Sequence, residues 1–89
     1  MVKPKAVYSE NAQSIITFLQ ANPNVDMTAK DLAEAIGLNS RVVNGTVTGL
    51  SRKGIAVRDE AEIDGKTVKY IHLTEAGRMA DPFAEKPAE

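Results

Sequence analysis

The chain has 89 residues, no cysteine and a net charge of −1 at pH 7. This length allows one small domain and excludes a large enclosed active site with a second domain. The absence of cysteine excludes disulfides and thiolate metal sites and is typical of a cytoplasmic protein. A net charge this close to zero does not by itself favour a nucleic-acid binder.

Residues 1–8 are expected to form a flexible N-terminal arm, because they contain Pro4 and two lysines. They show no signal-peptide pattern, and no apolar run approaches the roughly 20 residues that span a bilayer, so we expect no membrane partner. Ser9 is suited to cap the first helix, which Asn22-Pro23-Asn24 ends. The apolar positions of this helix recur at helical spacing, at Ala12, Ile15, Ile16 and Leu19.

A second helix is predicted to begin at Thr28. Asp31 follows three positions later, which is the spacing of a capping box. Gly37 is a natural end for this helix, because glycine adopts the left-handed conformation that often follows a helix. The expected inner face consists of Leu32, Ala33 and Ile36.

Residues 40–54, SRVVNGTVTGLSRKG, fit two structures. Asn44-Gly45 between β-branched residues is typical of a tight hairpin turn, but the outer pairs of such a hairpin would have no apolar face. As a helix, with Asn39 or Ser40 as its cap, the segment buries three aliphatic side chains at roughly 1.5–3 kcal/mol each. This exceeds the cost of its two glycines, about 0.5–1 kcal/mol each. We therefore predict a helix with Val43, Val47 and Leu50 on its inner face, forming a helix-turn-helix with the preceding one.

A β-hairpin is predicted next. Residues 55–58 and 67–73 have the composition of strands, and Asp64-Gly65 between them is a preferred turn pair. The intervening acidic residues are expected to form a solvated loop, with weak Ca²⁺ binding as the alternative. They are Asp59, Glu60, Glu62 and Asp64.

Thr74 is suited to cap a short last helix that runs to about Ala80 and ends at Asp81-Pro82. Residues 81–89 are polar and contain proline, and are expected to be a disordered tail. The folded domain is thus expected to span residues 9–80.

Three segments occur in the order of a known fold. TAKDLAEAIGLNSRVV has the helix-turn-helix pattern, LSRKGIAVR resembles the junction of a recognition helix with the first wing strand, and YIHLTEAGR resembles the second wing strand followed by Leu-Thr-x-x-Gly. Across residues 28–80 the chain resembles a winged helix-turn-helix DNA-binding domain of the MarR-like class. The resemblance implies a mainly α fold with a small β wing (α+β): three helices, a two-stranded antiparallel wing and a short C-terminal helix. It also implies a small transcriptional regulator that binds double-stranded DNA sequence-specifically.

The helix at 40–53 carries the groups that suit a major groove. Residues 38–58 contain four basic and no acidic side chains, whereas residues 9–37 and 59–66 each carry a net charge of −3. Arg41, Asn44 and Thr48 are expected to read bases, since arginine matches guanine, asparagine matches adenine and the threonine methyl matches thymine. The remaining candidates are expected near phosphates or at the helix surface, and the full DNA-binding set is Ser40, Arg41, Asn44, Gly45, Thr48, Arg52, Lys53, Arg58, Lys66 and Lys69. The alternative is that these cations form only a solvated helix face.

Two other partners follow from the same residues. A homodimer is expected if DNA is the target, because one such helix reads only a half-site, and Phe18 of the first helix is a candidate exposed contact. The segment RDEAEIDGKTVK is more acidic than a DNA-contacting wing should be. The alternative function is therefore a protein-interaction winged helix, an adaptor or inhibitor that does not bind DNA.

Catalytic and metal-binding patterns were not found. His72 is the only histidine and has no cysteine partner, so we expect an ordinary strand histidine. No glycine-rich phosphate loop follows a strand and no serine lies in a nucleophile elbow. We expect no enzyme activity, no cofactor and no metal site.

Overall fold

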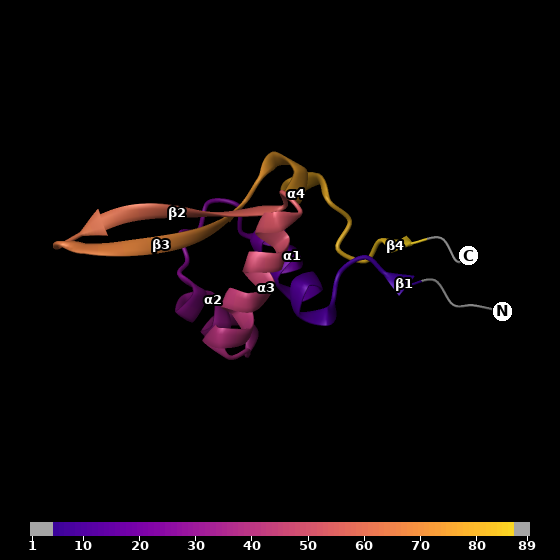
Figure 1. The fold of residues 1–89 in the computed structure, drawn as a ribbon, viewed down its shortest axis with the longest axis horizontal. Coiled ribbons are helices and arrows are strands. Elements are labelled where there is room, and N and C mark those ends of the chain that lie inside the picture. Colours follow the sequence, from indigo (N-terminus) through magenta and orange to yellow (C-terminus); the bar gives the residue numbers. More distant parts are fainter. Residues whose placement is uncertain (1–4, 87–89) are drawn as a thin grey trace.

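The computed structural model describes residues 5–86 and has the winged helix architecture expected from the sequence. Three helices form the body and a long two-stranded antiparallel hairpin, the wing, projects from it to one side (Figure 1). No helix within residues 5–86 is long and apolar enough to cross a membrane. The main elements are α1 (Glu10–Ala21), α2 (Ala29–Ile36), α3 (Ser40–Arg52), β2 (Ala56–Ile63), β3 (Lys66–Leu73) and α4 (Glu75–Met79).

The core lies where the three helices meet the base of the wing. The four predicted apolar positions of α1 and the three of α3 are all buried. Leu32 and Ala33 of α2 are buried as predicted, whereas Ile36 is only half-buried at the end of the helix. Ile71 and Leu73 of β3 add the contribution of the wing to the same core.

Side-chain caps begin the first two helices, as predicted. The Ser9 hydroxyl accepts a hydrogen bond from the Ala12 backbone N–H. Thr28 and Asp31 form a complete capping box, in which each side chain accepts from the backbone N–H of the other residue. These bonds satisfy N–H groups that have no partner within the helix.

The segment 40–52 is a helix rather than a hairpin. Asn39 caps it by accepting from the Arg41 backbone N–H, which decides between the two expected caps. Val43 and Val47 are fully buried and Leu50 is 2% exposed. Burial on α1 and α2 therefore outweighs the low helix propensity of a segment that contains two glycines.

The wing turns at Asp64 and Gly65, whose φ angles of 53° and 77° are both positive, as a type I′ turn requires. This turn sets the register, in which Ile63 pairs with Lys66 and Ala56 with Leu73. β2 is longer than the predicted segment 55–58 because pairing continues through the acidic residues to the turn. The prediction that these residues form a solvated loop was wrong about the backbone, although their side chains are exposed.

The Leu-Thr-x-x-Gly segment joins α4 to the start of the wing. The Thr74 hydroxyl accepts from the Gly77 N–H and lies 2.6 Å from the Gly54 carbonyl oxygen, to which it donates. Gly77 is buried against Ile55, and a Cβ at Gly77 would lie 2.1 Å from the Ile55 carbonyl oxygen. The motif therefore needs glycine because α4 touches the main chain between α3 and β2.

The two ends of the described chain lie side by side. β1 (Lys5–Ala6) pairs antiparallel with β4 (Glu85–Lys86), and the Val7 N–H donates to the Ala84 carbonyl at 3.0 Å. These pieces fall within the expected flexible arm and disordered tail, whose remaining residues, 1–4 and 87–89, lie outside the described residues. The domain boundaries at residues 9 and 80 stay predictions.

Candidate nucleic-acid interface

The outward face of α3 is made by the residues that do not pack on α1 and α2. Among the expected DNA-binding residues, Ser40, Arg41, Asn44, Gly45 and Arg52 are exposed, and Thr48 is half-buried. Asn39 caps the end at which Arg41 and Asn44 lie, and this is the end of a recognition helix that usually enters a groove. The structure thus brings these six residues together on one helix surface.

Arg41 and Arg52 leave their guanidinium groups open to solvent. Within residues 5–86, neither side chain makes a hydrogen bond or an ion pair with the protein. No acidic residue occurs on α3 itself. Both cations therefore have no neighbour on their own helix that competes with an anionic partner.

Arg58 reaches α3 from the base of the wing. Its Nη2 donates to the Asn44 carbonyl oxygen at 2.8 Å and to the Thr48 hydroxyl at 3.0 Å. The Thr48 hydroxyl in turn donates to the same Asn44 carbonyl at 2.9 Å. Because these bonds use the polar end of Thr48, its methyl group is the part left for an external contact.

Lys53 points away from this group. Its ammonium lies 3.2 Å from the Val7 carbonyl oxygen and 5.2 Å from the centre of the Tyr8 ring, so it holds the segment that precedes α1. Between that segment and α3 is a shallow hollow of about 300 Å³, and Gly45 and Gly49 lie along it. The two glycines are thus at an open surface rather than in a helix–helix contact.

The two wing lysines lie on opposite faces of the hairpin. Lys69 pairs with Glu60, with 3.8 Å between Nζ and Oε1, and shares a face with Arg58. Lys66 follows the turn and has the other orientation, because successive strand residues alternate between faces. The structure therefore does not gather Lys66 with the cations of α3.

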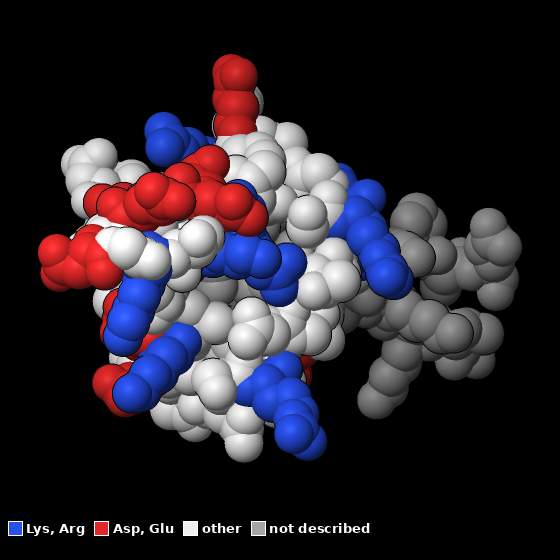
Figure 2. All heavy atoms as spheres, turned by 60° about the vertical axis from the view of Figure 1, so that its left-hand side comes forward, with Lys and Arg blue, Asp and Glu red and all other residues white. Residues whose placement is uncertain are grey.

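Acidic and basic side chains lie next to one another on the side of the molecule from which the wing projects (Figure 2). Most of the acidic side chains gather at the upper left of this view, with others at its top and lower left, and Lys and Arg lie above, below and beside them. This face as a whole therefore does not favour the binding of phosphate groups. The part of it that suits phosphate best is formed by the cations of α3 together with Arg58.

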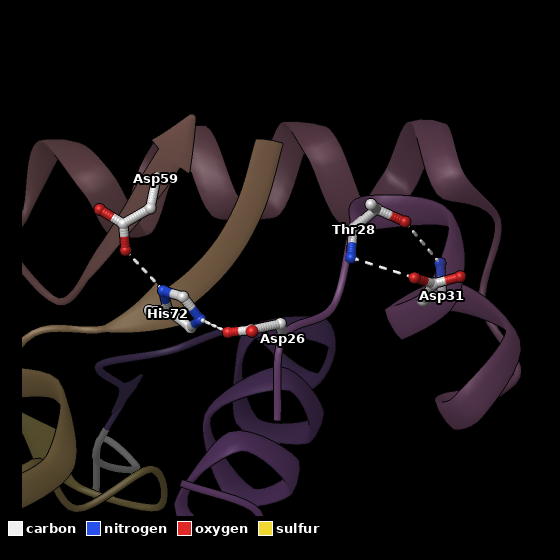
Figure 3. A network of polar contacts seen from close by, with 5 residues as sticks. All are labelled: Asp26, Thr28, Asp31, Asp59 and His72. Atoms are coloured by element: carbon white, nitrogen blue, oxygen red, sulfur yellow. Dashed lines mark hydrogen bonds and ion pairs between the residues drawn. The ribbon is translucent and has the colours of Figure 1, made fainter. Parts of the chain in front are cut away.

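His72 has a role that the sequence did not indicate. Its imidazole ring lies between the carboxyl groups of Asp59 and Asp26, as Figure 3 shows. The hydrogen bond with Asp59 is the main reason that the pKa of His72 is raised above 6.5; partial burial lowers it, and the bond with Asp26 and both negative charges raise it. No spacing rule links residues 26, 59 and 72, so no local signal was present. No group in the described part of the chain has the ligands to hold a metal ion.

Comparison with protein-family models found no match. A search of curated proteins found no match either. Solved structures do match. The Staphylococcus aureus transcription regulator MepR, solved in complex with DNA, superimposes with a TM-score of 0.71 and 24% identity over 81% of this chain and 57% of that chain.

Two further solved chains show the same similarity. NMB1585, a MarR family regulator from Neisseria meningitidis, matches with a TM-score of 0.65 and 24% identity over 80% of this chain and 48% of that chain. PefR, solved without heme, matches with a TM-score of 0.68 and 24% identity over 81% of this chain and 61% of that chain. The chain spans about half the length of MepR and NMB1585. The chain therefore has the winged helix-turn-helix fold of the MarR-like class.

Proposed function

We propose that this chain binds double-stranded DNA sequence-specifically, with α3 in the major groove, and acts as a small transcriptional regulator without catalytic activity or cofactor. The observation that carries the proposal is the position of Arg58, which extends the exposed cationic surface of Arg41 and Arg52 from α3 onto the base of the wing. A cationic surface centred on a recognition helix attracts the DNA backbone and presents hydrogen-bond donors to base edges. The solved DNA complex of MepR supports the proposal by analogy of fold.

The residues of this surface have different roles in the proposal. Arg41 and Asn44 bond purine edges, and the Thr48 methyl contacts a thymine methyl. Gly45 allows α3 to approach the DNA closely. Ser40 is the first residue of α3, and its hydroxyl bonds the DNA backbone. Phosphate contacts come first from Arg52 and Arg58, which lie beside the base-reading residues. The cations at the periphery of this surface are Lys53, Lys66 and Lys69.

The proposed DNA-binding form is a homodimer, because one helix of this kind reads only a half-site. Phe18 is half-buried and lies at a broad surface hollow on α1 together with Ile36 and the exposed Phe83. This hollow is the proposed contact between copies. Sedimentation velocity with and without a DNA duplex tests this dimer. A chain that remains a monomer when all of it is bound to DNA contradicts the dimer.

Binding of a random-sequence duplex, measured by fluorescence anisotropy at about 50 mM salt, tests the function, since electrostatic binding is strong at that ionic strength. We expect binding that weakens steeply with salt. Selection from a DNA library then gives the preferred site. Arg41→Ala is expected to relax preference at one position, at a cost of about 1–3 kcal/mol, whereas Arg52→Ala weakens all sequences alike. Absence of binding at low salt rejects the function.

A second function is favoured by a specific observation, the exposed apolar and acidic wing. Val57 and Ile63 are 39% and 45% exposed, and four acidic side chains lie between or next to them. Such a surface suits a protein partner better than DNA, so the alternative is an adaptor or inhibitor. Recovery of one stoichiometric protein, insensitive to nuclease, together with no DNA binding favours this alternative.

A further inference from the structure

The side chain of His72 joins three separate parts of the chain (Figure 3). Its Nδ1 lies 2.5 Å from Oδ2 of Asp59 on β2, and its Nε2 lies 2.9 Å from Oδ1 of Asp26 in the loop between α1 and α2. The partners are 13 and 46 residues away in sequence. We call this group the Asp26–His72–Asp59 clasp.

The clasp is complete in only one protonation state of the ring. A neutral imidazole has one N–H and one lone pair, so it donates to one carboxylate and turns a lone pair toward the other. An imidazolium has two N–H groups and donates to both carboxylates with charge-assisted bonds. The observed geometry, with an acceptor at each nitrogen, is therefore the geometry of the protonated ring.

The loop that carries Asp26 leads directly into the helix-turn-helix. Met27 follows Asp26, and its carbonyl accepts from the Ile71 N–H at 2.8 Å. Thr28 comes next and caps α2. The wing is thus attached to the start of α2 by two neighbouring contacts. The backbone bond does not titrate, and the side-chain contact through His72 does.

Two other titratable or charged groups lie near the ring. Arg78 of α4 lines the same small hollow as His72 and is the cation of that hollow. Tyr70 lies two residues before His72 on the same face of β3 and pairs with Asp59 across the strands. The pKa of His72 is nevertheless set by the two carboxylates and by burial: the bond with Asp59 raises it most, burial lowers it, and Asp26 raises it further.

We propose that His72 is a positioning residue whose protonated ring ties the wing to the start of the helix-turn-helix, so that the wing loosens when the ring loses its proton. Resting on the proposed function, the consequence is a DNA affinity that falls as pH rises. The wing carries Arg58 at its base, and Arg58 bonds the carbonyl and hydroxyl groups of α3. A loosened wing therefore disturbs a cation of the DNA-binding surface without changing any base-reading residue.

The direction of the pH effect follows from the raised pKa. The folded chain binds the His72 proton more tightly than the unfolded chain does, so this contribution to stability is fully present below 6.5. It disappears as pH rises through the pKa of the folded state. All three side chains are partly exposed, at 29% for His72, 68% for Asp26 and 60% for Asp59, so the effect is modest.

The first test is an NMR titration of the free protein, which is clear because His72 is the only histidine. We expect the pKa of His72 to lie above 6.5 and to fall in Asp59→Asn and Asp26→Asn. The backbone amides of β2, β3 and the Asp26 loop should shift with the same midpoint. Asp64→Asn at the wing tip is the matched control, because it removes the same charge from the wing far from the ring and keeps a residue that tolerates positive φ. A pKa of 6.5 or below that the aspartate variants do not change, with amides that do not respond, overturns the proposal.

The second test measures DNA affinity between about pH 6 and pH 8, where His72 is the side chain whose ordinary pKa lies nearest. We expect the wild type and Asp64→Asn to lose affinity about twofold to fivefold, the range that partly exposed ion pairs give. His72→Gln, which does not titrate, should lose this dependence. An equal slope in His72→Gln overturns the proposal. If no variant binds DNA at any pH, the proposed function fails, and the titration of the free protein still decides on the clasp.

Discussion

Helix α3 and the wing belong to the same winged helix domain, but they differ in the charge and the contacts of their side chains. α3 exposes Arg41 and Arg52 without protein partners in the described chain and has no acidic residue. The distal wing has three acidic residues, and one of its two lysines is paired with Glu60. The helix therefore has two cations without a protein partner in the described chain, whereas the distal wing carries more negative than positive side chains.

The difference shows that the two halves of the wing differ in charge and in contacts. Its base carries Arg58 on the side of α3 and His72 on the side of the Asp26 loop. Its tip carries Glu60, Glu62 and Asp64, with the turn at Asp64 and Gly65. The base thus contacts the helix, and the acidic tip does not favour entry into a minor groove, in which the field is strongly negative.

The largest expected effect comes from breaking the joint between helix and wing. Gly77→Ala places a Cβ 2.1 Å from the Ile55 carbonyl, so α4 or the start of β2 must move. We expect a loss of about 1–3 kcal/mol or more of unfolding free energy, as for overpacking elsewhere. Chemical denaturation measures it.

Gly49→Ala is the matched control for this variant, because nothing lies within 4 Å of the added methyl. It should be neutral or stabilise the chain by up to about 1 kcal/mol, since alanine is the better helix former. Equal destabilisation by both substitutions contradicts the close contact at Gly77.

An intermediate effect is expected from filling the open surface of α3. Gly45→Leu has room in the folded chain, and leucine gains about 0.5–1 kcal/mol of helix propensity. The side chain also stands where the helix must approach its partner, so DNA affinity should fall by about tenfold, a loss of roughly 1.4 kcal/mol. Denaturation and anisotropy on the same preparation separate the two effects. A stabilised variant with unchanged affinity places the DNA contact elsewhere.

The smallest effect is expected at the wing tip. Glu62→Gln removes one exposed negative charge from β2, so DNA affinity should rise by about twofold at low salt for all sequences alike. The gain should disappear at high salt because exposed charges are screened. Glu62→Lys changes the charge by two units instead of one, so its change in the free energy of DNA binding should be about twice that of Glu62→Gln. A gain that depends on DNA sequence would mean that the wing tip reads bases.

Local chemistry made the architecture predictable. Ser9, Thr28 and Thr74 were expected to cap helices and do so. The Asp64-Gly65 turn was placed correctly for the same reason, since its backbone conformation depends on the residues of the turn itself. Predictions based on such short-range bonds need no knowledge of the remaining chain.

The length of β2 and the contacts of individual side chains were less predictable. β2 extends past Arg58 to the turn because it pairs with β3, although the sequence there is acidic and unfavourable for a strand. Lys53 was grouped with Arg52 by sequence, but it turns to Val7 and Tyr8 instead. The outward face of α3 was predictable from its helical period, and the positions of Lys53, Lys66 and Lys69 relative to that face were not.

The sequence by itself thus determined the order of the helices, the turn of the wing and the polar face of α3, because neighbouring residues decide caps, turns and helical period. Only the tertiary structure decided that Arg58 bonds α3 and that His72 lies between Asp59 and Asp26. The residues of these contacts come from different elements, and the packing of β2 and β3 on the helical core sets the distance between them. The chemistry of the side chains alone does not fix such distances. The distances depend on how elements that are far apart in sequence pack together.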